Sequence, residues 1–166
     1  MTAGTDQQQA VELRPGQAPP GFIEVDGSKS PLSIPDWVVW GSTLRLLADA
    51  SGNEASQFYA ELQLSSAERT RVVDVALAQN DRDRTCEQRI LALGERLKGV
   101  EVQRILALTQ QEQIRCRVET LDAAEDLLAN LSPSSARRLQ QFVDDMRSTA
   151  QVWVPREGLA HFKRPR

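Results

Sequence analysis

The chain has 166 residues, of which 40% are hydrophobic and 26% are charged, proportions typical of globular proteins. This length suits one domain with tails. A net charge of −3 argues against a general nucleic-acid binder, which needs excess Lys and Arg to displace counterions from phosphate groups. Because no apolar run approaches the roughly 18–20 residues that cross a bilayer, no membrane span is expected either.

Composition also indicates the fold class. Aromatic residues make up only 5% of the chain, whereas strong helix formers such as Leu, Ala, Gln, Glu and Arg dominate it. We therefore expect an all-α protein, namely a helical bundle with one long antiparallel helical hairpin and an extended amino-terminal arm.

The chain is expected to divide into three parts. Residues 1–32 contain four of the eight prolines and four of the nine glycines, which predicts an arm that is either flexible or bound to a partner. Residues 33–155 should form the helical bundle, and residues 156–166 a basic tail. The start has no basic region followed by an apolar stretch, which predicts a cytoplasmic protein as written, or a periplasmic one if the start is processed or engineered.

The first predicted helix begins near Pro35, where a missing N–H costs nothing, and Ser33 is placed to cap it. It should end at the Ser-Gly-Asn sequence of residues 51–53, and a shorter helix is expected over residues 54–62. Apolar residues at helical spacing give the first helix one buried face, which consists of Trp37, Trp40, Leu44 and Leu47.

Three further helix starts are marked by capping sequences. Ser65 with Glu68, and Thr109 with Glu112, have the spacing of a capping box. In this motif the hydroxyl accepts from the third helical N–H, and the carboxylate accepts from the cap N–H. Ser132 before a proline repeats the pattern. Helices are therefore predicted to start near residues 65, 109 and 132.

The helix from residue 65 should turn back near Gly99, so that it forms the hairpin with its successor. Residues 100–107 either form a separate turn or already belong to that successor. The polar residues 79–85 favour a solvated stretch where the helix outruns its partner, and a kink or a charged contact site is the alternative. After the last helix, residues 152–155 should pack back on the bundle as an apolar segment. Along the three later helices, the side chains expected to be buried are Val72, Val75, Ala76, Cys86, Ile90, Leu93 and Leu97, then Ile114, Val118, Leu121, Leu127 and Leu128, and then Ala136, Leu139, Phe142, Val143 and Met146.

The two cysteines of the chain lie at similar heights in this predicted hairpin. Cys86 and Cys116 are about equally far from the turn at Gly99, so a disulfide between them is geometrically possible. The alternative is that both remain buried thiols, as Cys residues commonly do.

Residue types needed for catalysis are sparse. The single histidine, His161, lies in the basic tail without the partners of a catalytic triad. No Cys and His cluster suits zinc, and no glycine-rich loop suits a phosphate. Four carboxylates share one predicted helix, but they lack the Glu-x-x-His motif of diiron bundles and are expected to be solvated. These are Glu119, Asp122, Glu125 and Asp126. We therefore expect no catalytic residue, no metal and no cofactor, and hence no enzyme.

The three tryptophans are the strongest candidates for contact with a partner, because Trp is enriched in binding hot spots. Trp37 and Trp40 lie on the first predicted helix, and Trp153 follows the last one. A shared aromatic core is the alternative for these three. Phe162, among the cations of the basic tail, is a further candidate for partner binding.

The Leu-(Ser/Thr)-x-x-Glu sequences that begin at Leu64 and Leu108, together with the long hairpin, resemble the Spy-like periplasmic chaperones over residues 64–146. Members of that family carry Leu-Thr-x-x-Gln motifs. The resemblance implies a helical chaperone that binds unfolded clients on a concave, largely basic surface. Residues 34–40, and the cap before Phe142, also look like uncharacterised helical proteins from bacteria, which implies a fold and no function.

The expected function is a non-enzymatic structural or adaptor role. The protein would bind one or more protein partners, either as a homo-oligomer or within a larger assembly. The alternative is an exported, Spy-like stress chaperone that binds unfolded clients.

Overall fold

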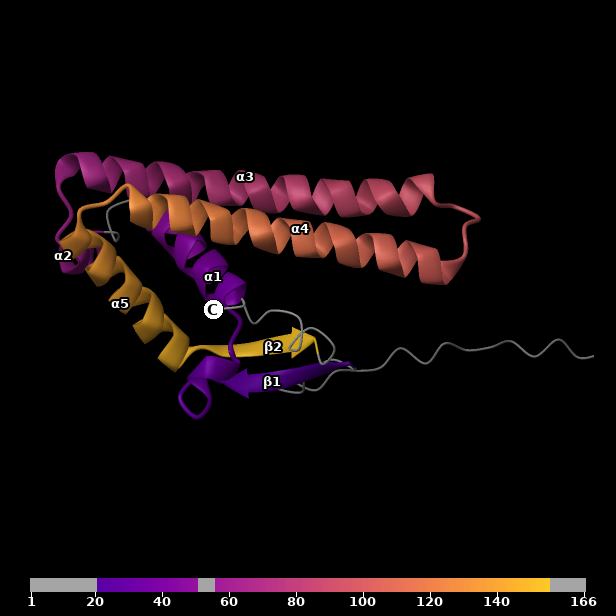
Figure 1. Cartoon of the computed structure of the whole chain (residues 1–166), viewed down its shortest axis with the longest axis horizontal. Helices are drawn as coiled ribbons and strands as arrows, with labels where there is room; N and C mark the ends of the chain where they lie inside the picture. The colour runs from indigo at the N-terminus through magenta and orange to yellow at the C-terminus, as the bar shows by residue number, and fades with distance from the viewer. Residues whose placement is uncertain (1–20, 51–55, 156–166) are drawn as a thin grey trace, which may run out of the picture.

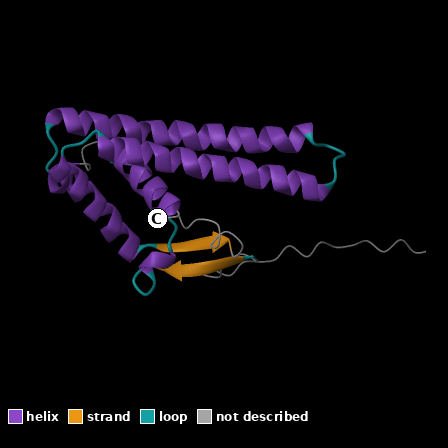
Figure 2. Ribbon diagram, viewed as in Figure 1, coloured by secondary structure: helices purple, strands orange, loops and turns teal. Residues whose placement is uncertain are grey.

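The computed structural model describes residues 21–50 and 56–155. This part of the chain contains five α-helices and one two-stranded sheet, and two long helices lie side by side as a hairpin (Figure 1). The elements are β1 (Phe22–Asp26), the 3-10 helix η1 (Pro31–Ser33), α1 (Asp36–Asp49), α2 (Ser56–Leu62), α3 (Ser66–Arg96), α4 (Val102–Ala129), α5 (Pro133–Thr149) and β2 (Gln151–Pro155). The helical bundle with one long hairpin is therefore confirmed (Figure 2). None of the described helices is both long and apolar enough to cross a bilayer.

Helix α1 follows Pro35 directly and packs against both helices of the hairpin and against α5. Its buried face includes Trp40, Leu44 and Leu47, as the helical spacing predicts. The neighbouring α2 is held to it by a buried hydrogen bond, in which the Tyr59 hydroxyl donates to the Leu47 carbonyl over 3.0 Å. The first helix and its short successor thus close one end of the bundle.

The hairpin begins at the capping box that the sequence predicts. Ser65 Oγ accepts from the Glu68 N–H over 3.2 Å, and Glu68 Oε2 accepts from the Ser65 N–H over 3.0 Å. Helix α3 then continues for 31 residues. The chain reverses at Gly99, whose φ of +86° lies in the left-handed region that favours glycine.

The predicted helix start near residue 109 is wrong. Helix α4 already begins at Val102, so Thr109 and Glu112 lie inside it and do not form a cap. The Glu112 carboxylate instead lies 3.2 Å from Arg89 Nε on α3. Residues 102–107 therefore belong to α4, because packing along α3 carries the helix past a sequence that could have capped it.

The core lies where α1, α2 and α5 join the hairpin. Helix α5 starts as predicted, with Ser132 Oγ accepting from the Ser135 N–H over 3.3 Å, and it buries Leu139 and Val143. Two core predictions for α4 are wrong, because Ile114 and Val118 are exposed. Around Ile114 and Val118, the side of α4 that faces its neighbours is more polar. The buried residues of α4 lie towards its carboxyl-terminal end and are Thr120, Ala124 and Leu127.

A two-stranded antiparallel sheet joins the two ends of the described chain, and the sequence analysis did not anticipate it. Val25 of β1 lies opposite Val152 of β2, and both contribute to the core on one face of the sheet, while Glu24 and Trp153 form the next pair along. Residues 22–32 of the predicted arm are therefore part of the fold, and residues 152–155 belong to a strand. The remainder of the predicted arm, residues 1–20, and the basic tail lie outside the described residues.

The sheet is anchored to the end of α5 through a glycine. The Gly27 N–H donates to the Ala150 carbonyl over 2.8 Å. A Cβ atom at Gly27 would lie 1.9 Å from the carbonyl oxygen of Arg147, so only glycine allows this approach. The Arg147 guanidinium donates in turn to the Ile34 carbonyl over 2.7 Å and to Asp36 over 2.6 Å.

Candidate functional site

The far half of the hairpin extends beyond the other described elements (Figure 1). On this half, large apolar side chains are open to solvent: Leu91 is 63% exposed, Val102 68% and Leu106 57%. Ile114 and Val118 are exposed as well. Helices α3 and α4 therefore carry apolar surface that the other described residues leave uncovered.

A shallow groove marks the place where α1 leaves the hairpin. Its volume is about 470 Å³, and it is lined by Arg45, Asp83, Cys86, Glu87, Ile90 and Leu91. Arg45 of α1 reaches across its edge and donates from Nε to Asp83 Oδ2 over 2.6 Å. The groove therefore has an apolar wall on α3 and a charged edge beside α1.

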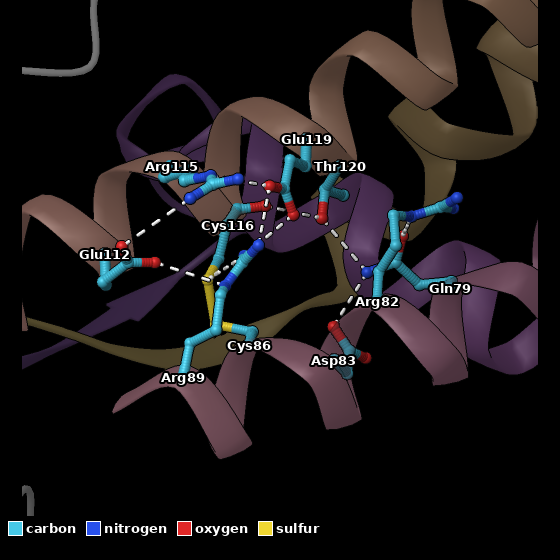
Figure 3. A network of polar contacts seen from close by, with 10 residues as sticks. All are labelled: Gln79, Arg82, Asp83, Cys86, Arg89, Glu112, Arg115, Cys116, Glu119 and Thr120. Atoms are coloured by element: carbon cyan, nitrogen blue, oxygen red, sulfur yellow. Dashed lines mark hydrogen bonds and ion pairs between the residues drawn. A yellow bond between two sulfur atoms is a disulfide. The ribbon is translucent and has the colours of Figure 1, made fainter. Parts of the chain in front are cut away.

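The polar stretch of α3 is only partly solvated: Asn80, Asp81, Arg84 and Thr85 are exposed, whereas Gln79, Arg82 and Asp83 make contacts. Gln79 is fully buried and donates from Nε2 to Thr120 Oγ1 of α4 over 3.1 Å and to Asp83 Oδ1 over 2.8 Å (Figure 3). Its Oε1 accepts from Arg82 Nε over 3.0 Å. The favoured interpretation of residues 79–85 therefore holds for the exposed residues, and the charged-contact alternative holds for Gln79, Arg82 and Asp83, because α1, α3 and α4 meet there.

One helical turn further out, Cys86 and Cys116 form a disulfide, with their Cα atoms 5.9 Å apart. The possible bridge is confirmed, and the alternative of two thiols is wrong. Arg89 lies beside it and donates to Glu119 through Nη1 over 3.1 Å and Nη2 over 3.0 Å, while its Nη2 is 3.4 Å from Cys116 Sγ (Figure 3). A covalent link and an ionic link therefore join α3 to α4 at the base of the exposed half.

The charges of this cluster neutralise one another. Hydrogen bonds from Arg89 hold the pKa of the Glu119 carboxyl below its usual range, and the same contact raises the pKa of Arg89. Arg115 of α4 adds a second cation, with Nε 3.1 Å from Glu119 Oε1. A carboxylate that is ionised and paired with two guanidinium groups is poorly suited to take up or release protons near neutral pH. Its role in this geometry is to hold two helices together.

Comparisons with protein-family models, with curated proteins and with solved structures give no match to this chain.

The structure separates the aromatic residues that the sequence grouped as candidate anchors. Trp40 is only 6% exposed and belongs to the core, whereas Trp37 is half-buried with the Arg117 guanidinium 4.4 Å from its ring centre. Trp153 lies on β2 and is 47% exposed. In the sequence it is far from the α3 residues that line the groove. Phe162 lies outside the described residues. The three tryptophans therefore do not form a shared aromatic core: Trp40 alone belongs to the core, and Trp153 is the most exposed of the three.

Among residues 21–50 and 56–155, no three His, Cys, Asp or Glu side chains gather in a way that could hold a metal ion. Sequence reasoning missed the exposed apolar residues of the hairpin. It assigned the apolar residues of the predicted seam to the core, and so placed Ile114 and Val118 inside. The available signal was the length of the hairpin, because two long helices outrun a first helix of 14 residues.

Proposed function

We propose that this protein is a non-enzymatic interaction protein, and that the far half of its α3–α4 hairpin binds another protein chain. The observation that carries this proposal is the exposure of Leu91, Val102 and Leu106 on helices whose other ends lie in the core. Monomeric proteins rarely leave several large apolar side chains open on one projecting element unless it is an interaction surface.

The construction of the hairpin favours the same function. The disulfide and the Arg89–Glu119 contact hold α3 and α4 in one arrangement before any partner arrives. A pre-organised surface loses little conformational entropy on association, so more of the apolar burial appears as affinity. A rigid element that carries exposed apolar side chains supports a structural or adaptor role.

The test is affinity capture from a native lysate with the purified, tagged protein, followed by mass spectrometry. We expect a partner to be retained by the unaltered protein and lost with the double variant Leu91→Ser and Leu106→Ser. The control is Leu32→Ser, which removes a leucine that is even more exposed, in η1 and away from the hairpin. Equal capture by the double variant and the control would show that the hairpin is not the binding element.

A client-binding chaperone is the second candidate, because the same exposed leucines could meet the apolar side chains of an unfolded chain. It predicts suppression of the aggregation of a chemically unfolded client at low molar ratio, and loss of this activity in the double leucine variant. Light scattering of the client measures both. Undiminished aggregation in the presence of the unaltered protein would exclude this candidate.

A further inference from the structure

One stripe of α3 and the following turn has a pattern that the proposed function does not use. Its five residues are all exposed and follow one another at intervals of three and four. Arg84, Glu87, Leu91 and Gly94 lie on α3, and Lys98 follows in the turn directly after it; we call these five residues the α3 stripe.

We propose that the α3 stripe is a self-association surface, on which a second copy of this chain docks its own α3 in antiparallel orientation. This proposal rests on the proposed function, because it names the protein chain that the hairpin binds. The two copies would be related by a twofold axis that passes between Leu91 and Gly94. Such an isologous arrangement is the commonest symmetry of soluble homo-oligomers.

The charges of the α3 stripe are complementary to themselves in this orientation. Glu87 and Lys98 lie equally far from the point midway between Leu91 and Gly94, on opposite sides of it. In an antiparallel pair, each Glu87 therefore faces the Lys98 of the other copy. In a parallel pair, each charged residue would instead face the same residue of the other copy, and the two like charges would repel each other.

The apolar centre of the stripe is complementary in shape. The same symmetry places Leu91 of one copy over Gly94 of the other. A Cβ atom added at Gly94 would meet nothing within 4 Å in a single chain, so the space above this glycine is open. A large side chain opposite a residue without a side chain lets two helices approach closely. A glycine inside a helix lowers the stability of that helix, but in the proposed dimer Gly94 leaves room for Leu91 of the other copy.

The groove beside α1 fits the other end of the partner helix. When the centres are aligned, the turn of the second copy, which carries Lys98, reaches the level of Glu87 and Asp83. Both carboxylates line the groove, and Ile90 forms its apolar wall. Asp83 is already paired with Arg45, so the Lys98 ammonium group would meet Glu87 while its aliphatic stem lies on apolar surface.

The test is sedimentation equilibrium of the purified full chain over a wide concentration range. We expect a dimer with a dissociation constant in the micromolar range. Glu87→Lys and Lys98→Glu should each weaken it about tenfold, because attraction becomes repulsion twice in every dimer. The double variant Glu87→Lys with Lys98→Glu should restore the original affinity. The control is Asp122→Lys, which makes the same charge change as Glu87→Lys but on α4, away from the α3 stripe, and it should have no effect.

A second variant tests the centre of the stripe. Gly94→Gln should weaken the dimer at least tenfold because the new side chain occupies the place of Leu91 of the other copy. The variant should fold normally, since Gln favours a helix more than Gly does, and circular dichroism checks this.

Two outcomes overturn the proposal. One is a monomer at all concentrations, and the other is a dimer that neither Gly94→Gln nor the charge reversals weaken. If the pure protein is monomeric but lysate capture still depends on Leu91 and Leu106, the hairpin binds a different protein. The self-association inference then fails while the proposed function stands. If neither is seen, both fail.

Discussion

Glu68 joins the starts of two helices with a single carboxylate. Its Oε2 accepts from the Ser65 N–H over 3.0 Å at the start of α3 and from Ser135 Oγ over 3.0 Å in α5. Its Oε1 accepts from the Ser132 N–H over 2.9 Å at the start of α5. The capping box with Ser65 was predictable from a spacing of three residues. The contact with Ser132 was not, because it depends on how α5 returns to α3.

This arrangement makes stability depend on pH in a defined direction. The hydrogen bond from the Ser132 backbone, and then that from Ser65, lower the pKa of Glu68 from 4.5 to about 2. A depressed folded-state pKa means that the stabilisation is complete above pH 4.5 and is lost as the pH falls towards 2. We expect Glu68→Gln to lower the midpoint of urea unfolding at pH 7 and to flatten its decline between these pH values. Glu61→Gln, on exposed α2 surface, is the control, and an equal effect of both variants would contradict this role.

The hairpin shows how an element is decided by more than its own sequence. Thr109 and Glu112 have the spacing of a cap, yet α4 passes through them because Glu112 contacts Arg89 across the hairpin. Gln79 lies in a stretch that reads as solvated, yet it is buried because Thr120 of α4 satisfies its amide. In both places the sequence alone does not decide whether a polar residue is capping, solvated or buried. A contact with a residue on the other helix decides it.

The disulfide should be a major source of stability for this element. Cys86 and Cys116 are separated by 30 residues, and closing a loop of that length restricts the unfolded chain by about 3–4 kcal/mol in the loop-entropy model. We expect reduction to lower the free energy of unfolding by that amount, measured by urea denaturation followed by circular dichroism. The double variant Cys86→Ser and Cys116→Ser should match the reduced protein. An unchanged urea midpoint after complete reduction would show that the hairpin does not rely on the bridge.

In the whole molecule, the hydrophobic core and the projecting part of the hairpin lie in different places. The core gathers where α1, α2 and α5 meet the hairpin, and the two-stranded sheet ties residues 22–26 to residues 151–155 on the same side. The far half of α3 and α4 stands apart from this core (Figure 1). Folding and binding should therefore respond to different substitutions.

Two leucine substitutions test this separation. Leu139→Ala, at a fully buried position of α5, should lower the free energy of unfolding by about 2–5 kcal/mol because it leaves a cavity. Leu106→Ala, at an exposed position of α4, should change it by no more than about 0.5 kcal/mol. Urea denaturation at a low protein concentration compares the two. A large loss of stability for Leu106→Ala would mean that the hairpin surface belongs to the folding core.

Local patterns alone were enough to recognise the helices and most of their starts. Pro35, the Ser65–Glu68 box and the Ser132 cap act on backbone groups within one turn, so the sequence beside them predicts their effect. The possible bridge between Cys86 and Cys116 came from counting outward from Gly99, which works because helices rise by a constant amount per residue.

The remaining features depend on residues far apart in the chain. The partner of Val25 is Val152, the partner of Glu68 is Ser132, and no spacing rule links such pairs. The exposure of Leu91 is of the same kind, because periodicity identifies an apolar helix face but cannot tell whether another helix covers it. Burial and strand pairing are properties of the packed chain, whereas capping and helical periodicity are properties of neighbouring residues.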